Sequence, residues 1–270
     1  MPVIIITGAS DGIGAEMARQ LAVGPNVQLV LAARKQATLD DVARQCQALG
    51  AQTLVVPTDV REQTQCQALI DAAVQAYGRI DTLINNAGVS AQALFADVQA
   101  RDLRWYEDLM RVNLWGSVWC THAALPHLRA SQGRLVAVSS LAGLAGVPGR
   151  TAYSATKFAM VGFFEALRTE ERGQGVSVTI AYPGVVATQI RYHGLNAQGV
   201  AAGASGLKED KAMSVETCAR LIVQGLQARK REVVMTAAGK IGRFLKLFAP
   251  GLVETLTLSA LKEDVKPRRD

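Results

Sequence analysis

Closely spaced cysteines are missing from this chain. Its four cysteines, Cys46, Cys66, Cys120 and Cys218, are scattered along 270 residues and form no C-x-x-C pair. A disulfide framework or a zinc cluster requires several ligands at short, regular spacing. We therefore expect these cysteines to be small core or helix residues of a protein from a reducing compartment.

Long apolar segments are missing as well. No run approaches the roughly 20 residues that a helix needs to span a bilayer. The first strand-like run, Val3–Thr7, begins almost at Met1, which leaves no room for a signal or transit peptide. With 49% hydrophobic and 19% charged residues, the chain has enough apolar material for a substantial core. These features predict a soluble, folded, cytoplasmic protein.

Motifs for nucleic acid and for metal are also absent. The net charge is +6, but the basic residues are spread along the chain and no helix-turn-helix, finger or aromatic-basic patch stands out. Such a charge attracts an anionic cofactor or substrate, favours an acidic membrane surface, or keeps the protein soluble. His122 and His127 are five residues apart, which is not metal-ligand spacing, so both are expected to be structural. We expect no nucleic-acid partner and no metal site.

Short β-branched runs alternate with longer helical patterns from one end of the chain to the other. Apolar runs without polar alternation are typical of strands covered by helices on both faces of a sheet. Strand–helix–strand repetition implies right-handed crossovers between parallel strands. The pattern predicts an α/β fold: one doubly wound Rossmann-type domain over residues 1–239, with a seven-stranded parallel sheet. The expected strands are Val3–Thr7, Val27–Ala33, Thr53–Pro57, Thr82–Asn85, Leu135–Ser139, Val176–Ala181 and Glu232–Thr236.

Two later segments break this alternation. Residues 189–213 are rich in Gly and Ala and have no firm period, which is typical of a lid; within them Tyr192 and His193 are candidate substrate contacts. Residues 240–270 are expected to be a helical C-terminal extension of the same domain. Its first helix is amphipathic and basic, with an apolar face of Ile241, Phe244, Leu245 and Phe248 and, elsewhere, Lys240, Arg243 and Lys246.

A glycine-rich turn follows the first expected strand, in the order Thr-Gly-Ala-Ser-Asp-Gly-Ile-Gly. Glycines at such a point permit a tight turn and let the backbone approach a pyrophosphate, whose charge meets the N-terminus of the next helix. A strand-to-helix turn with no ligand would explain a glycine triplet equally well. Its position after the first strand of an alternating chain favours a dinucleotide site formed by Gly8, Ser10, Asp11, Gly12, Ile13 and Gly14.

The end of the second expected strand indicates which dinucleotide binds. An acidic residue there would hydrogen-bond the 2′-hydroxyl of the ribose and repel a 2′-phosphate. This chain has Ala33 followed by Arg34. The missing carboxylate and the available guanidinium both favour the phosphate of NADP(H), although an arginine that merely opens a loop is the alternative.

Tyr153 and Lys157 are four residues apart in a helical pattern, so both side chains lie on one face. A tyrosine is a poor acid–base catalyst at neutral pH because its ordinary pKa is about 10, and a nearby ammonium favours the phenolate. By itself this pair is a common coincidence. Ser140 ends the fifth expected strand, where ligands of open α/β sheets bind, and its hydroxyl can hydrogen-bond a substrate oxygen. Asn113 lies in the helical run Trp105–Ala124.

Taken together, these motifs resemble the short-chain dehydrogenase/reductase family, nearest its hydroxysteroid dehydrogenase and long-chain ketone reductase branch. The resemblance covers nearly the whole chain. It implies that Tyr153 is the proton donor and acceptor, and that Ser140 positions the substrate oxygen. Lys157 would favour the ionised tyrosine and bind the nicotinamide ribose, and Asn113 would hold a water in a proton relay through Lys157. The motifs are TGASDGIG, Asp59-Val60, NNAG, Asn113, SS-x-AG, Y-S-A-T-K, and Pro183-Gly184 followed by Thr188.

The same resemblance implies the remaining cofactor contacts. Asp59 and Val60 would flank the adenine. The other cofactor contacts would be Asn86, Ala87 and Gly88 along the cleft, and Pro183, Gly184, Val186 and Thr188 at the nicotinamide end. By analogy with the family, the chain would form a homodimer or homotetramer through the helices that bear Asn113 and Tyr153, where Phe158, Phe163 and Phe164 would be buried.

These motifs indicate a reaction, the interconversion of a carbonyl and an alcohol with NADP(H), but not the substrate. The lid and the basic extension favour a hydrophobic, steroid- or lipid-like substrate. A 3-oxoacyl-thioester reductase and a non-catalytic NADP(H)-binding sensor are the alternatives. Residues 240–261 would contact a membrane surface, cover the substrate mouth, or pack on the same chain or a dimer mate.

Replacing Arg34 tests the cofactor assignment. In Arg34→Asp the new carboxylate repels a 2′-phosphate and accepts a hydrogen bond from a 2′-hydroxyl, so the preference should move from NADP(H) toward NAD(H). The measurement is the Michaelis constant for each cofactor with one reducible ketone. Unchanged constants for both cofactors would contradict the assignment.

Overall fold

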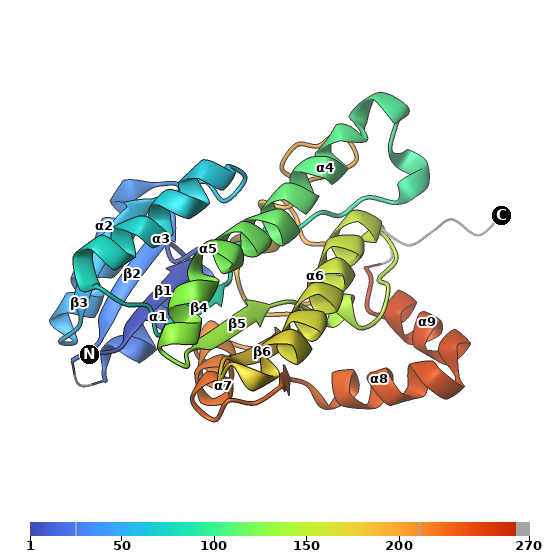
Figure 1. Ribbon diagram of the computed structural model, residues 1–270. Coiled ribbons are helices and arrows are strands. Elements are labelled where there is room, and N and C mark those ends of the chain that lie inside the picture. Colours follow the sequence, from blue (N-terminus) through green and yellow to red (C-terminus); the bar gives the residue numbers. More distant parts are fainter. Residues whose placement is uncertain (25, 211, 263–270) are drawn as a thin grey trace.

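The computed structural model describes residues 1–24, 26–210 and 212–262. Seven strands form one sheet in the order β3-β2-β1-β4-β5-β6-β7, and every pair is parallel (Figure 1). The doubly wound α/β sheet predicted from the sequence is therefore confirmed, with strand bounds shifted by at most two residues. The strands are β1 Val3–Thr7, β2 Gln28–Ala33, β3 Gln52–Pro57, β4 Thr82–Asn85, β5 Arg134–Val138, β6 Ser177–Tyr182 and β7 Glu232–Val234.

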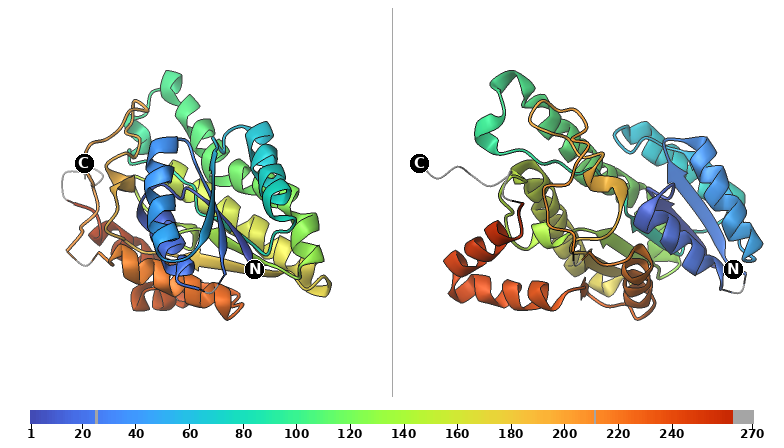
Figure 2. Two further views of the ribbon diagram at one scale, coloured as in Figure 1. Left: turned by 90° about the vertical axis from the view of Figure 1, so that its left-hand side faces the viewer. Right: turned by 180° about the vertical axis from the view of Figure 1, so that it is seen from behind.

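Helices cover both faces of this sheet, as Figures 1 and 2 show. Helices α1, α2 and α7 pack on one face, and α3, α5 and α6 pack on the other. The helices are α1 Gly12–Ala22, α2 Gln36–Ala48, α3 Gln63–Tyr77, α4 Arg104–Met110, α5 Gly116–Ala130, α6 Thr151–Glu170, α7 Val215–Gln227, α8 Ala237–Phe248 and α9 Pro250–Ser259. Among the described residues, no helix is both long enough and apolar enough to cross a bilayer.

The first strand shows why its sequence is continuously apolar. Ile4 and Ile6 join the core beneath α1, α2 and α7, whereas Val3 and Ile5 join the core beneath α3, α5 and α6. Successive side chains of a strand point to opposite faces, and here both faces are covered by helices. All five residues of β1 are buried, and four of them are apolar; the exception is Thr7 at the end of the strand.

The loops after β1 and β4 are joined where the strand order reverses direction. The Thr7 hydroxyl accepts hydrogen bonds from the backbone N–H groups of Asn86 (3.0 Å) and Ala87 (3.1 Å). In return, the Asn86 side-chain amide donates to the carbonyls of Thr7 (3.0 Å) and Gly8 (3.1 Å). Open α/β sheets bind their ligands at such a switch point, and these four bonds hold its two sides together.

Two features differ from a simple alternation of strand and helix. The expected helix Trp105–Ala124 is interrupted by a π-helical turn, Arg111–Trp115, between α4 and α5. In the described part of residues 189–213 the backbone forms a 3₁₀ turn, Gln189–Arg191, followed by loops. Figure 2 shows these loops running beside the segment after β4, to which an isolated bridge from Ala91 to Leu195 joins them.

Candidate active site

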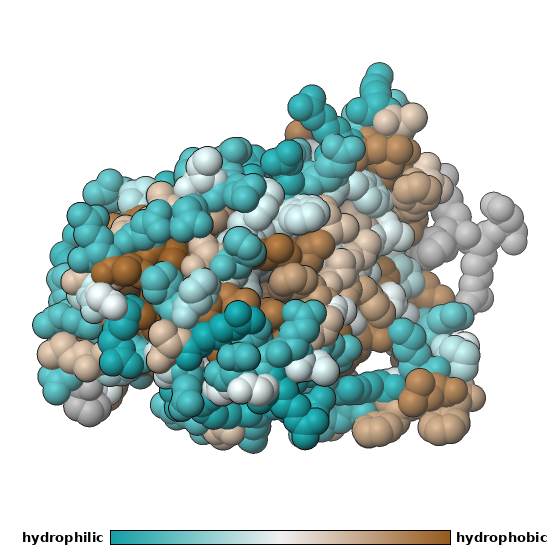
Figure 3. All heavy atoms as spheres, in the orientation of Figure 1, coloured by the Kyte–Doolittle hydropathy of each residue, from teal (hydrophilic) through white to brown (hydrophobic). Residues whose placement is uncertain are grey.

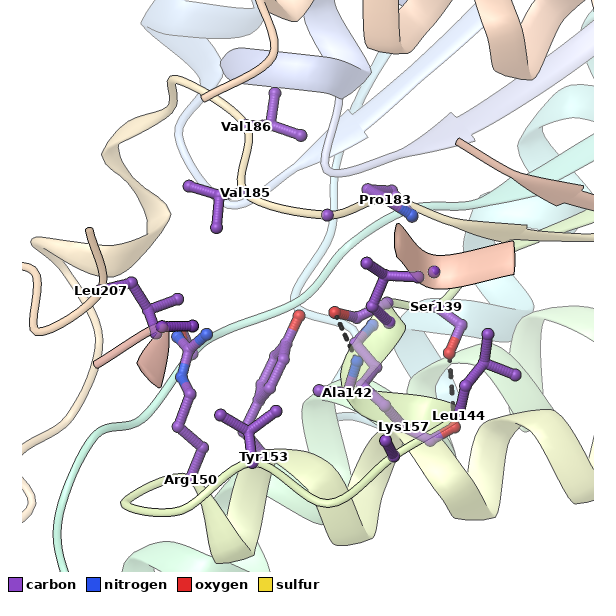
Figure 4. Close-up of a pocket in the computed structure, with 18 of the residues that line it drawn as sticks. Ser139, Ala142, Leu144, Arg150, Tyr153, Lys157, Pro183, Val185, Val186 and Leu207 are labelled. Carbon is purple, nitrogen blue, oxygen red and sulfur yellow. Dashed lines mark hydrogen bonds between the residues drawn. The ribbon is translucent and has the colours of Figure 1, made fainter. Parts of the chain in front are cut away.

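A cavity of about 450 Å³ opens beyond the carboxyl ends of β4, β5 and β6 (Figure 4). It brings together side chains that are far apart in the sequence, from the first helix to the last. Ten of the residues predicted from the sequence line its wall: Ile13, Asn86, Gly88, Ser140, Tyr153, Lys157, Pro183, Gly184, Val186 and Thr188.

Tyr153 and Lys157 lie one turn apart on α6, as their spacing predicts, and both are buried. The Lys157 ammonium donates to the carbonyl of Val138 at the end of β5 (2.9 Å), and its Nζ lies 5.7 Å from the centroid of the Tyr153 ring. Burial lowers the pKa of Lys157 below its usual range, and the neighbouring Tyr153 opposes that change. The lysine is thus a cationic group held beside the phenol by one backbone carbonyl.

Asn113 is fully buried in the π-helical turn and does not line the cavity. Its side-chain amide donates to the carbonyl of Val89 and to the hydroxyl of Thr156, both at 2.9 Å, and its oxygen accepts from the N–H of Val89 (2.8 Å). A Cβ on Gly88 would lie 3.3 Å from Asn113 Oδ1 and 3.8 Å from Lys157 Nζ. Asn113 therefore flanks the same glycine as Lys157, from inside the protein. Single π turns often mark functional sites.

The two adjacent serines after β5 have different surroundings. Ser140 lines the cavity, and its hydroxyl accepts the N–H of Ala142 (3.2 Å) at the start of a 3₁₀ turn. The Ser139 hydroxyl donates to the carbonyl of Lys157 (3.4 Å), and a Cβ on Gly143 would lie 2.7 Å from its oxygen. Figure 4 shows both bonds. Ser139 fastens α6 to β5, and Ser140 remains available to a ligand.

The glycine-rich turn has the shape that a dinucleotide needs. Gly8 and Gly12 have φ angles of +66° and +53°, which side chains other than glycine rarely adopt. A Cβ on Gly14 would lie 2.1 Å from the Gly8 carbonyl oxygen, so the helix start and the strand end approach as closely as glycine allows. Asp11 caps only the N–H of Gly12 (2.6 Å), and the next N–H groups of a helix N-terminus have no intrahelical partner. These residues fit a bound pyrophosphate.

Three expected adenine-side residues lie outside the cavity wall. Arg34 is exposed after β2. Asp59 forms an ion pair with Arg61 (2.6 Å), whose hydrogen bonds lower the pKa of the Asp59 carboxyl, with a smaller contribution from Arg34. Val60 is buried against Gly116: a Cβ added to Gly116 would lie only 2.7 Å from the Cβ of Val60. The other predicted cofactor residues outside this wall are Gly8, Ser10, Asp11, Gly12, Gly14 and Ala87.

Several wall residues were not foreseen from the sequence. Arg150 and Arg191 reach the cavity from the start of α6 and from the 3₁₀ turn after β6. Arg150 immediately precedes α6 and stands three residues before Tyr153, at a position that is ordinarily solvated, so nothing local indicated its burial. Helices α8 and α9 also line the cavity, which agrees with one of the alternatives expected for residues 240–261, that of covering the substrate mouth. The remaining apolar wall residues are Val138, Leu141, Ala142, Leu144, Ala145, Val147, Val185, Ile190, Leu207, Ala238, Val253, Leu256 and Ala260.

Comparison with known proteins connects this geometry to a family. Residues 2–198 match the family model described as short chain dehydrogenase. The chain belongs to the short-chain dehydrogenase family. It is therefore an oxidoreductase of a family that binds a nicotinamide cofactor, and the family predicted from the sequence motifs is confirmed.

Relatives of this short-chain dehydrogenase include two curated plant proteins. The 11-beta-hydroxysteroid dehydrogenase A of Sesamum indicum is 33% identical over 258 residues, 93% of this chain and 73% of its own. The 11-beta-hydroxysteroid dehydrogenase of Pinus massoniana is 35% identical over 262 residues, 93% of this chain and 72% of its own. These names confirm the hydroxysteroid dehydrogenase branch. A short-chain dehydrogenase/reductase from Burkholderia phymatum, solved with NAD, has a TM-score of 0.79 at 26% identity and covers 93% of this chain and 94% of its own.

Lys157→Met tests the proposed pairing on α6. Loss of the ammonium should reduce turnover by roughly 100-fold or more. The free energy of unfolding in urea should stay within about 1 kcal/mol or rise, because the variant no longer buries a cation.

Lys230→Met replaces an exposed lysine and serves as the control; it should leave both quantities unchanged. Normal turnover in Lys157→Met would refute the role given to this lysine.

Proposed function

We propose that this short-chain dehydrogenase is an NADP(H)-dependent oxidoreductase that interconverts a ketone and a secondary alcohol on a hydrophobic, steroid- or lipid-like substrate. One observation carries the proposal: Tyr153, Ser140 and Lys157 line a single cavity whose remaining wall is largely apolar. A phenol and a hydroxyl suit a carbonyl oxygen, and the apolar wall suits a hydrocarbon skeleton.

In this proposal the chain positions the substrate and moves a proton. The Ser140 hydroxyl donates a hydrogen bond to the substrate oxygen as negative charge develops there. In reduction, Tyr153 transfers its phenolic proton to that oxygen, and in oxidation it takes the proton back. The Lys157 ammonium stabilises the resulting phenolate, and Asn113 supports the proton path behind it. When bound, the nicotinamide supplies or accepts the hydride.

The choice of NADP(H) rests on the charges after β2 and β3. Arg34 is exposed and forms no ion pair with another described residue. The neighbouring Asp59, which would otherwise attract Arg34, already pairs with Arg61. A free guanidinium at this position suits the 2′-phosphate of NADP(H).

A homo-oligomer is also proposed. Trp115 is 46% exposed and stacks on Trp119 of α5, with ring centroids 5.9 Å apart, and Phe158 of α6 is 38% exposed. Exposed aromatic side chains are typical of subunit contacts. Phe164, however, is fully buried within its own chain, so the expectation that a partner subunit buries it was wrong.

The apolar face of α8 supports a peripheral membrane contact. Two of its three cations contact the body of the protein: Lys246 donates to the carbonyl of Leu144 (3.0 Å) and Arg243 pairs with Glu232. Phe244 and Phe248 are 67% and 85% exposed, and Figure 3 shows apolar side chains gathered at this protruding corner. Exposed apolar helix faces are typical of proteins that lie on a membrane surface.

The cysteines are in keeping with a cytoplasmic location. Cys46, Cys66, Cys120 and Cys218 are all buried and free, as core thiols of a reducing compartment would be.

Tyr153→Phe tests the reaction. The variant keeps the ring but loses the transferable proton, so turnover of ketones, steroids and 3-oxoacyl thioesters with NADPH should fall by roughly 100-fold or more. Binding of NADPH, followed by its fluorescence, should remain. Unchanged turnover on every active substrate would refute the mechanism. Thioesters as the best substrates would instead favour the 3-oxoacyl reductase, and no turnover of any substrate by the wild type would favour a sensor.

The membrane contact is tested with the double variant Phe244→Ser/Phe248→Ser. Sedimentation with phosphatidylcholine–phosphatidylserine vesicles should weaken roughly tenfold or more, because two exposed aromatic side chains no longer enter the lipid. The control is Phe95→Ser, which removes another exposed phenylalanine. Equal sedimentation of the wild type and the double variant would exclude the contact.

A further inference from the structure

Arg150 is placed beside the proposed proton donor. It immediately precedes α6, and its guanidinium carbon lies 4.9 Å from the centroid of the Tyr153 ring. Figure 4 shows the two side chains standing next to each other at the cavity, with Leu207 beside the guanidinium. A group bound to Arg150 would therefore lie within a few bonds of the atom that Tyr153 protonates.

This arginine is buried without a counter-charge. Only 8% of Arg150 is exposed. Its Nε donates to the carbonyl of Ala91 (3.3 Å) and its Nη2 to the hydroxyl of Ser90, and both acceptors are neutral. No carboxylate among the described residues lies within 4.0 Å of it, and its Nη1 has no hydrogen-bond partner there. A buried charge without a partner is unfavourable, so this site favours an anion.

A second buried arginine increases the positive charge nearby. Arg191 is 7% exposed; it pairs with Glu209 (2.7 Å) and donates to the carbonyl of Val186 (2.8 Å). Its Nη2 is buried and has no partner among the described residues. Burial lowers the pKa of Arg150 below its usual range, the neighbouring Tyr153 opposes that change, and the charge of Arg191 adds a smaller lowering. Glu209 thus pairs with Arg191, and no carboxylate among the described residues pairs with Arg150.

The charged side chains of the cavity wall also favour an anionic ligand. Four basic side chains line the cavity, and neither Asp nor Glu is among its described lining residues. Arg243 is neutralised by Glu232, and Lys157 lies beside Tyr153. Arg191 pairs with Glu209, so Arg150 is the arginine of this wall that has no carboxylate partner among the described residues. The basic lining residues are Arg150, Lys157, Arg191 and Arg243.

We propose that Arg150 determines substrate specificity by binding a carboxylate, or a similar oxyanion, carried on the substrate close to the reacting carbonyl. The substrate class would be an apolar ketone or alcohol that bears an acidic group, a keto acid or hydroxy acid. This inference rests on the proposed function and names its substrate class. The alternative is that Arg150 only ties α6 to the loop after β4 through Ser90 and Ala91.

A matched pair of substrates separates these two roles. The probes are 4-oxodecanoate and its methyl ester, which share the ketone and the chain but differ in charge, with kcat/KM measured at saturating NADPH. Because a hydrogen bond to a charged group contributes about 1.5–3 kcal/mol, the wild type should prefer the acid roughly 10- to 100-fold. Arg150→Met should abolish this preference by lowering kcat/KM for the acid while leaving kcat/KM for the ester unchanged. Arg150→Lys should keep part of the preference.

Arg243→Met is the control, because it removes another cation of the same wall and should leave the acid-to-ester ratio unchanged. Equal kcat/KM values for acid and ester in the wild type would overturn the proposal. So would an equal loss on both substrates in Arg150→Met, since that result would assign the arginine to the placement of Tyr153. If Arg150→Met does not fold, the wild-type ratio and the Arg150→Lys ratio decide.

A binding measurement with ligands that cannot be turned over tests the anion site independently of the proposed function. Calorimetry of the wild type with decanoate and with decanamide compares two ligands of one length that differ in charge and cannot be reduced as ketones. Tighter binding of decanoate supports the anion site even if no ketone is turned over, a result that would overturn only the proposed interconversion of ketone and alcohol. Equal binding of the two ligands overturns the anion site even if ketones are reduced.

Discussion

The hydrogen bonds between Thr7 and Asn86 are the constraint on which the candidate site depends. They join the loops after β1 and β4 at the point where the order of strands turns from one direction to the other. On one side of this junction the chain enters the glycine turn, and on the other it passes Gly88, which Lys157 and Asn113 flank. A displacement there would separate the two halves of the site. The Asn86 side-chain amide donates to two carbonyls of the turn, so this residue helps to hold the turn in place.

Much of the fold could be predicted because its information is local. The strands are short runs rich in apolar residues, and burial on both faces explains this for β1, where Ile4 and Ile5 enter different cores. Tyr153 and Lys157 could be paired because helical spacing determines which residues share a face. The π turn at Asn113 could not be predicted, because it accompanies hydrogen bonds from the Asn113 amide to Val89 and Thr156 that exist only in the folded chain.

The cavity wall was less predictable than the reacting residues. Arg150 was visible in the sequence as a charged residue near a helix start, which is ordinarily a solvated position. Its burial depends on contacts with Ser90 and Ala91, about sixty residues earlier in the chain. The walls from α8 and α9 likewise depend on tertiary docking through Lys246 and Leu144. Long-range packing of this kind leaves no periodicity in the sequence.

The hairpin of α8 and α9 borders the cavity on one side and solvent on the other. Its inner side, with Gly242 and Leu256, closes the cavity, and its outer side exposes Phe244 and Phe248. The same hairpin therefore borders both the cavity and the exterior of the protein. Thermodynamic reciprocity then applies: a surface that shifts the hairpin changes the affinity for substrate by some factor, and the substrate changes the affinity for that surface by the same factor. Substrate binding and the proposed surface contact are linked equilibria wherever both act on this hairpin.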